Sequence, residues 1–202
     1  MTYSTQFFAD QTGVAYPSAR AVLPDLIREL DVTSVVDVGC GVGAWAAVAK
    51  EQGCTVLGVD GHVEPAQCLV DEFERVDLSQ GYDCSGWDLA VCLEVAEHLP
   101  EASSGPLVAG LCQARYVLFS GAHPGQGGVD HQNEQWGSWW ESLFRVHGFE
   151  ASNHLKWQHW SDETVADFYR ENMLLFARPS DSEDRFRGAV DVLHPSRFGQ
   201  WP

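Results

Sequence analysis

The sequence predicts an α/β fold in which helices cover both faces of a largely parallel sheet. Apolar, β-branched runs such as residues 34–38 are too uniform for half-exposed strands, so they indicate central parallel strands. These runs alternate with stretches of helical period, a pattern typical of right-handed βαβ units. The 202 residues suffice for one such domain. We place it at residues 1–178, with a helical cap over 1–30 and a polar C-terminal extension over 179–202.

The first half of the chain predicts a helix and a strand, and then repeats the pair. Pro17 suits the first turn of a helix over 17–30. The strand over 34–38 leads through glycines into a helix over 43–52, which Gly53 closes. The next elements are a strand over 55–59, a helix over 64–74 and a short strand over 75–77.

The second half continues this alternation and then changes character. An apolar strand over 89–93 precedes a helix over 100–112 and a strand over 116–120. A polar, glycine-rich loop follows over 121–135, at the end of a strand, where open α/β sheets bind ligands. The last elements are a Trp-rich helix over 136–148, a strand over 153–157, a helix over 162–169 and a strand over 172–178.

Composition argues against several partners. The net charge is −17, from 12 Lys and Arg against 29 Asp and Glu, and it would repel a nucleic acid backbone. No apolar run is long enough to span a bilayer, and the first residues lack a signal-peptide pattern, so we expect a cytoplasmic protein without membrane contact. The six cysteines lie singly, which predicts reduced thiols.

The segment from Asp37 to Asp60 predicts a nucleotide-binding crevice. A strand ends near Asp37, glycines follow at positions 39, 41 and 43, and a second strand leads to Asp60. This spacing also permits NAD, with Asp60 on the ribose. However, Asp37 would repel a pyrophosphate and attract a ligand that carries an ammonium and a sulfonium. Asp77 can accept from an adenine amine, and no tyrosine has the lysine four positions later that a short-chain NAD enzyme needs.

Four motifs in order resemble those of class I S-adenosylmethionine (SAM)-dependent methyltransferases: residues 36–43, Asp60, residues 76–78 and residues 88–99. The resemblance covers roughly residues 15–178. It implies SAM as cofactor and a Rossmann-like three-layer sandwich, whose seven-stranded, mostly parallel sheet has an antiparallel last strand. By position it assigns cofactor binding to Asp37, Gly39, Cys40, Gly41, Asp60, Gly61, Asp77, Leu78, Leu93 and Glu94.

The acceptor half of the site is expected in the loop over 121–135. A hydroxyl acceptor must lose a proton on methylation, so histidines with acidic neighbours are candidate bases. His131 is the preferred base, and the other candidates are His123, His98 and Glu134. Residues 119–140 also resemble a bacterial methyltransferase subgroup found beside small-molecule and glycan pathways. This resemblance implies that an oxygen or nitrogen of a small molecule or sugar accepts the methyl group.

Other interpretations stay open at this point. The chain could be a catalytically inactive cofactor-binding partner of another enzyme, or an NAD-dependent oxidoreductase. A DNA methylase is disfavoured by the charge and by the missing base-flipping motif. His123, Asp130, His131 and Glu134 offer mixed nitrogen and oxygen ligands, but their spacing fits no standard signature, so we expect no metal. The sequence leaves a homodimer open.

Overall fold

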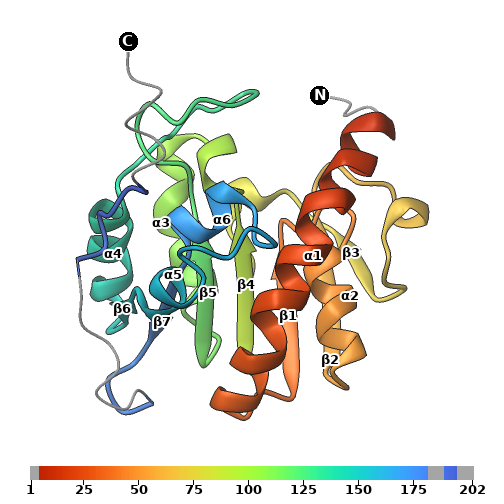
Figure 1. The fold of residues 1–202 in the computed structure, drawn as a ribbon, viewed down its shortest axis with the longest axis horizontal. Coiled ribbons are helices and arrows are strands. Elements are labelled where there is room, and N and C mark those ends of the chain that lie inside the picture. The colour runs from red at the N-terminus through yellow and green to blue at the C-terminus, as the bar shows by residue number, and fades with distance from the viewer. Residues whose placement is uncertain (1–4, 182–188, 195–202) are drawn as a thin grey trace.

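The computed structural model describes residues 5–181 and 189–194 (Figure 1). Seven strands form one sheet in the order β3-β2-β1-β4-β5-β7-β6. Within the described residues, β7 runs antiparallel to both of its neighbours, and the other pairs are parallel. The predicted fold class is therefore confirmed. The strands are β1 (Ser34–Val38), β2 (Thr55–Asp60), β3 (Phe73–Arg75), β4 (Leu89–Leu93), β5 (Tyr116–Ser120), β6 (Glu150–Ser152) and β7 (Leu174–Ala177).

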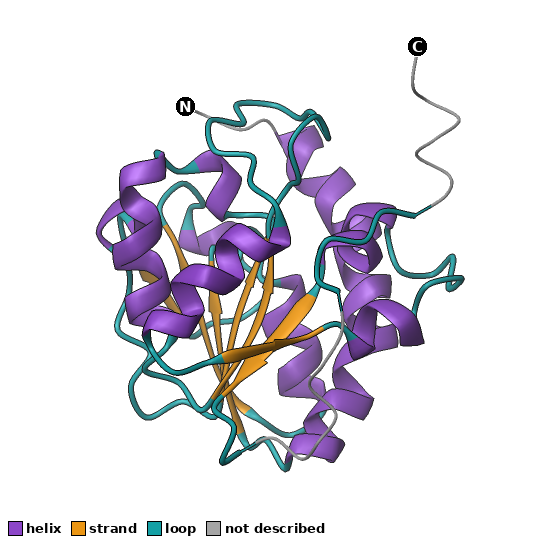
Figure 2. Cartoon of the chain, turned by 90° about the vertical axis from the view of Figure 1, so that its left-hand side faces the viewer, coloured by secondary structure: helices purple, strands orange, loops and turns teal. Residues whose placement is uncertain are grey.

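Helices lie on both faces of the sheet and complete a three-layer sandwich (Figure 2). One face carries α1 (Thr5–Leu30), α2 (Ala44–Glu51), α5 (His154–Gln158) and α6 (Asp167–Asn172). The other carries α3 (Ser104–Leu111) and α4 (Gly137–Val146). Short 3₁₀ turns form at Pro65–Gln67, Leu78–Gln80, Ala96–His98 and Glu101–Ser103. Among the described helices, none has the length and apolar character to cross a bilayer.

The central strands are buried on both faces, as their uniform sequence predicts. In β1, Val35 belongs to the core formed with α1 and α2, while Val36 belongs to the core formed with α3 and α4. An aromatic cluster anchors the second core, where the rings of Phe144 and Phe176 stack with centroids 3.8 Å apart. This packing fixes the strand ends from which the site is built.

The helix predicted over 64–74 is wrong. A 3₁₀ turn over Pro65–Gln67 forms in its place. The Leu69 N–H then donates to the Val42 carbonyl (2.8 Å). This hydrogen bond holds the extended segment around Leu69 against the glycine-rich loop. β3 pairs with β2 and begins two residues before the predicted strand. The tertiary contact with the loop therefore overrides the local helical tendency.

The strand predicted over 153–157 is also wrong, because these residues form α5 and the edge strand β6 precedes them. Leu155 and Lys156 are neighbours in sequence and both are buried, whereas Trp157 is 52% exposed. The apparent alternation of Leu155 and Trp157 is thus not the burial pattern of a strand. The helix predicted over 162–169 begins later, as α6.

The predicted C-terminal extension over 179–202 falls largely outside the described residues. Its second described part lies against α4 and α5. Lys156 Nζ donates to the Val190 carbonyl (2.9 Å), and the Ser138 N–H donates to the Asp191 carboxylate (2.8 Å). These contacts hold part of the predicted polar extension against the domain.

Asp88 ties two strands together at the amino-terminal edge of the parallel strands. Its Oδ2 accepts hydrogen bonds from the Thr33 N–H (2.8 Å), the Thr33 hydroxyl (2.7 Å) and the Ser34 N–H (3.1 Å). Asp88 directly precedes β4, and Ser34 begins β1. This clamp lies at the edge opposite the glycine-rich loop.

Candidate active site

Two adjoining cavities lie at the carboxyl ends of the parallel strands. The larger has a volume of about 490 Å³ and lies beyond β2 and β3. The smaller, of about 300 Å³, is covered by residues of α1 and α6. Four residues line both cavities, which therefore meet beyond β1 and β4: Gly39, Gly41, Glu94 and His98.

The glycine-rich loop leaves room for a ligand at this meeting point. Gly39 has a φ of +78°, and a Cβ built on it would lie 2.3 Å from Cγ2 of Val95. A larger residue therefore meets both backbone strain and a steric clash. Cys40, beside it, is buried, and its thiol pKa is raised by a hydrogen bond with Cys68 and by burial. Cys40 thus contributes to the loop through its backbone, without a reactive thiolate.

Asp60 organises the entrance to the larger cavity from the end of β2. Its Oδ1 accepts from the N–H groups of His62 (2.7 Å) and Val63 (3.2 Å). Its Oδ2 accepts from the Gly41 N–H (3.0 Å). The carboxylate is thus held between the glycine-rich loop and the turn after β2.

The far side of the larger cavity is formed by Asp77 and Leu78. Asp77 accepts from the Ser79 N–H (2.9 Å), and hydrogen bonds from the Ser79 backbone and side chain lower the pKa of this carboxyl. Leu78 is buried and gives the cavity an apolar wall. Gly61 lets the chain approach closely, because a Cβ there would lie 2.9 Å from the Val76 carbonyl oxygen. Carboxylates around an apolar wall suit a nucleoside.

Asp37 is buried beneath the smaller cavity, which it lines together with Leu93. Its Oδ2 accepts one hydrogen bond, from the Ala46 N–H (3.2 Å). Burial raises the pKa of Asp37 to about 8, against the opposing effect of that hydrogen bond. A cationic group entering the cavity would favour the ionised form of this carboxyl.

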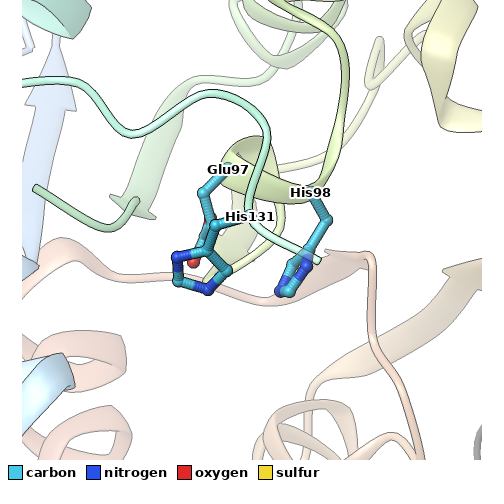
Figure 3. Close-up of side chains that lie close together, drawn as sticks. All are labelled: Glu97, His98 and His131. Atoms are coloured by element: carbon cyan, nitrogen blue, oxygen red, sulfur yellow. The ribbon is translucent and has the colours of Figure 1, made fainter. Parts of the chain in front are cut away.

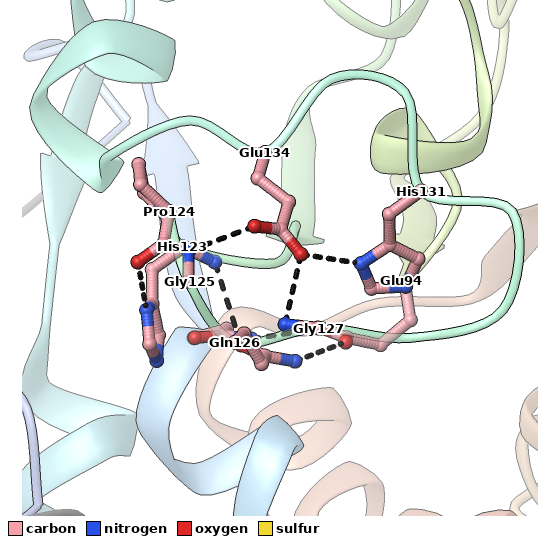
Figure 4. A network of polar contacts seen from close by, with 9 residues as sticks. Glu94, His123, Pro124, Gly125, Gln126, Gly127, His131 and Glu134 are labelled. Atoms are coloured by element: carbon pink, nitrogen blue, oxygen red, sulfur yellow. Dashed lines mark hydrogen bonds and ion pairs between the residues drawn. The ribbon is translucent and has the colours of Figure 1, made fainter. Parts of the chain in front are cut away.

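Glu94 belongs to a polar network, and Figure 4 shows its contact with Gln126. Its backbone has a φ of +55° directly after β4. Its Oε1 accepts from the Ser120 hydroxyl (2.8 Å) and from Asn172 Nδ2 (3.2 Å), and its Oε2 accepts from Gln126 Nε2 (3.4 Å). The side chain thus joins β4, β5, α6 and the loop after β5.

Three of the four candidate catalytic residues meet beside Glu94. The rings of His98 and His131 form an edge-to-face contact with centroids 4.9 Å apart. His131 Nδ1 lies 2.9 Å from Glu134 Oε1. Glu134 also accepts from the N–H groups of Gly125 (2.8 Å) and Gly127 (2.9 Å) (Figure 4). Although burial opposes them, these hydrogen bonds keep the pKa of Glu134 below its usual value.

His123 lies apart from this group. Its ring stacks on Trp136 with centroids 5.8 Å apart, and its Nδ1 lies 3.2 Å from the Pro124 carbonyl oxygen. It lines a separate small cavity that also contains Lys156. The structure therefore does not bring His123 to the other candidate bases.

A model of the methyltransferase domain family matches residues 15–171. The chain belongs to the class I SAM-dependent methyltransferases. This finding confirms the family resemblance that the four sequence motifs indicated.

Known proteins similar to this methyltransferase include ubiquinone biosynthesis O-methyltransferase from Escherichia coli, with 33% identity over 81 residues. That match covers 35% of this chain and 34% of the relative, so the chain matches about a third of the curated relative's length. Magnesium protoporphyrin IX methyltransferase from Synechocystis PCC 6803, solved with bound SAH, has a TM-score of 0.61 and 18% identity, covering 88% of this chain and 90% of that one. Streptomyces venezuelae DesVI has a TM-score of 0.62 and 12% identity, covering 86% and 96%. Both likenesses show the shared fold.

Sequence reasoning assigned no role to several residues that line the smaller cavity of this methyltransferase. Glu97, in the 3₁₀ turn Ala96–His98, is 1% exposed. Burial and the neighbouring Glu94 carboxylate raise the pKa of Glu97 well above its usual value. The available signal was a second acid three residues after Glu94, in the turn after a buried strand. Residues from α1 and α6 carried no local signal: Val14, Ala15, Phe168 and Tyr169.

Proposed function

We propose that this methyltransferase binds SAM across the two cavities and transfers its methyl group to an oxygen or nitrogen of a small molecule or sugar. The joined cavities carry this proposal, because one offers Asp60 to a ribose and the other offers a buried carboxyl, Asp37, to a cationic group. Relatives named for ubiquinone biosynthesis and magnesium protoporphyrin IX support a small-molecule acceptor. The net charge of −17 argues against nucleic acid.

The placement of the two halves follows from the lining residues. The adenosine part of SAM would occupy the larger cavity, with its ribose at Asp60 and its adenine between Asp77 and Leu78. The methionine part would extend toward Asp37 and Leu93. The methyl group would then face the junction of the cavities, where an acceptor can approach it in line.

His131 is the residue that we propose to promote loss of the acceptor's proton. The acceptor atom forms a bond to the methyl carbon while the methyl–sulfur bond breaks, and the sulfur keeps the electron pair. A hydroxyl acceptor releases its proton in this step. The Glu134 carboxylate at 2.9 Å fixes the orientation of the His131 ring, which lines the smaller cavity.

Substitution of His131 tests the proposed function. We expect His131→Gln to leave SAM affinity in calorimetry nearly unchanged and to lower the methyl-transfer rate by about 100-fold or more. The acceptor is sought by mass spectrometry as a gain of deuterated methyl in an extract incubated with labelled SAM. His147→Gln, at the exposed end of α4, is the matched control. Unchanged turnover in His131→Gln would remove its catalytic role, and SAM binding without turnover on any acceptor would favour an inactive cofactor-binding partner.

SAM binding should release a proton from Asp37. The pKa of this carboxyl is about 8 in the free protein, so it is largely protonated at pH 7. The ligand's positive charges stabilise the carboxylate, so affinity should rise by up to about tenfold per unit between pH 6 and 8. Calorimetry at pH 7 in buffers of different ionisation enthalpy measures the released proton, and Asp37→Asn should abolish it. Affinity independent of pH would contradict this role.

The same group should make stability of the free protein depend on pH in the opposite direction. Its folded pKa lies above its unfolded value of about 3.9, so the folded state binds more protons between these values. The stabilising contribution is complete below about pH 4 and is lost as the pH rises through about 8. Asp37→Asn should remove this part of the pH dependence in denaturant titrations.

A further inference from the structure

Glu97, His98 and His131 lie close together and line the smaller cavity (Figure 3). One ligating atom of each residue lies within 4.8 Å of the ligating atoms of the other two. Two imidazoles and a carboxylate are donors that suit divalent cations: imidazole suits Zn²⁺, and carboxylate suits Mn²⁺. We infer that these three side chains hold a divalent cation beside the acceptor.

Several donor atoms of this cluster are buried and make no hydrogen bond within the described residues. Glu97 is 1% exposed, and among the described residues neither of its carboxylate oxygens has a hydrogen-bond partner. Within the same part of the chain, His98 Nδ1 is buried without a partner. Ionising this buried carboxyl without a compensating charge costs several kcal/mol. A cation bound between the three side chains would offset this cost.

The backbone holds the two ligand-bearing segments together. The N–H groups of Gln132 (2.8 Å) and Asn133 (3.1 Å) both donate to the Glu97 carbonyl. Gln132 Nε2 donates to the His98 carbonyl (2.8 Å). The turn after β4 and the loop after β5 are therefore joined at the ligands themselves, so little ordering is required when a cation binds.

His131 has the surroundings of a metal-ligating histidine. Its Nδ1 faces Glu134 at 2.9 Å, which leaves Nε2 for a cation. A carboxylate on the second ring nitrogen is the usual arrangement for such ligands, because it fixes the ring and raises its basicity. Glu134 is itself fixed by the Gly125 and Gly127 N–H groups.

Three protein ligands leave coordination positions open, as in catalytic sites. An acceptor hydroxyl bound there would lose its proton to water more readily, and its oxygen would form the bond to the methyl carbon as the methyl–sulfur bond breaks. This catalytic part rests on the proposed function and makes His131 act as a ligand instead of a free base. The sequence-based expectation of no metal rested on the side chains of the loop over 121–135 alone. Glu97 and His98 come instead from the turn after β4.

Cation binding tests the inference directly. Chelator-treated protein is dialysed against Zn²⁺ or Mn²⁺ and its metal content is measured. We expect one equivalent per chain, and about 100-fold weaker binding in Glu97→Gln and His131→Gln. Glu101→Gln and His147→Gln, on exposed positions, are the matched controls. Where a variant fails to fold, a Co²⁺ titration of the wild-type chain gives an independent readout, because nitrogen and oxygen ligands produce visible absorption bands.

The outcomes separate the cation site from the proposed function. No stoichiometric binding, or equal binding by Glu97→Gln, would overturn the site. If the chelated protein also binds SAM and transfers methyl groups at the wild-type rate, the proposed function stands with His131 as a free base. If the protein binds a cation but not SAM, the site stands and the proposed function fails.

Discussion

Asp60→Ala is expected to weaken SAM binding by about 100-fold or more. Hydrogen bonds from ribose hydroxyls to a carboxylate contribute about 1.5–3 kcal/mol each, and the variant removes both. It also leaves the Gly41 and His62 N–H groups without the acceptor that orders them. Isothermal titration calorimetry with SAM measures the loss.

Two further variants separate these contributions. Asp60→Asn keeps an oxygen for the His62 N–H but loses the charge, so its affinity should lie between wild type and Asp60→Ala. Asp25→Ala makes the same change of net charge at an exposed position on α1, where Asp25 pairs with Arg28, and should leave affinity unchanged. Wild-type affinity in Asp60→Ala would place the ribose elsewhere.

Gly39→Ala is expected to destabilise the protein and to reduce SAM binding sharply. A residue with a Cβ costs about 1–2 kcal/mol in the left-handed region, where Gly39 has a φ of +78°. The new methyl group would also lie 2.3 Å from Val95 Cγ2, and such overpacking costs about 1–3 kcal/mol. Because Gly39 lines both cavities, a shift of the loop that relieves the clash would change the space available to the ligand. Denaturant unfolding and calorimetry measure the two effects.

Gly53→Ala is the matched control for this substitution. Gly53 has a φ of +88°, but a Cβ there meets no atom within 4 Å. The Gly53→Ala variant should show only the backbone destabilisation and should bind SAM normally. The double variant Gly39→Ala/Val95→Ala should recover part of the binding that Gly39→Ala loses. Equal effects of Gly39→Ala and Gly53→Ala would show that the contact with Val95 is unimportant.

The grouping of the proposed donor-half residues was predictable because they belong to contiguous motifs. The strand from Ser34, the glycines and Asp60 follow one another along the chain, and two neighbouring parallel strands bring them to one edge. The helix over 64–74 and the strand over 153–157 failed for another reason. There, contacts with the glycine-rich loop and the burial of Lys156 decide the local structure, and neither can be read from local spacing.

The proposed acceptor half depends on contacts between distant segments, so the sequence predicted the grouping of its residues less well. His131 and Glu134 were correctly placed together, because they are three residues apart in one loop. Glu97 joins them through backbone hydrogen bonds between residues more than 30 positions apart. His123 lies in the same loop but stacks on Trp136, because the chain turns between His123 and His131. Membership of one loop therefore does not establish membership of one site.

The Asp88 clamp lies at the amino-terminal edge of the parallel strands, and the cavities lie at the opposite edge. The two edges should therefore differ in how well they tolerate substitutions. The hydrogen bonds of Asp88 with Thr33 and Ser34 tie β1 to β4, and none of these three residues lines either cavity. Engineering for heat resistance can therefore start at this edge, since a stabilised clamp holds the strands without stiffening the glycine-rich loop. The usual trade-off between robustness and turnover should be weakest there.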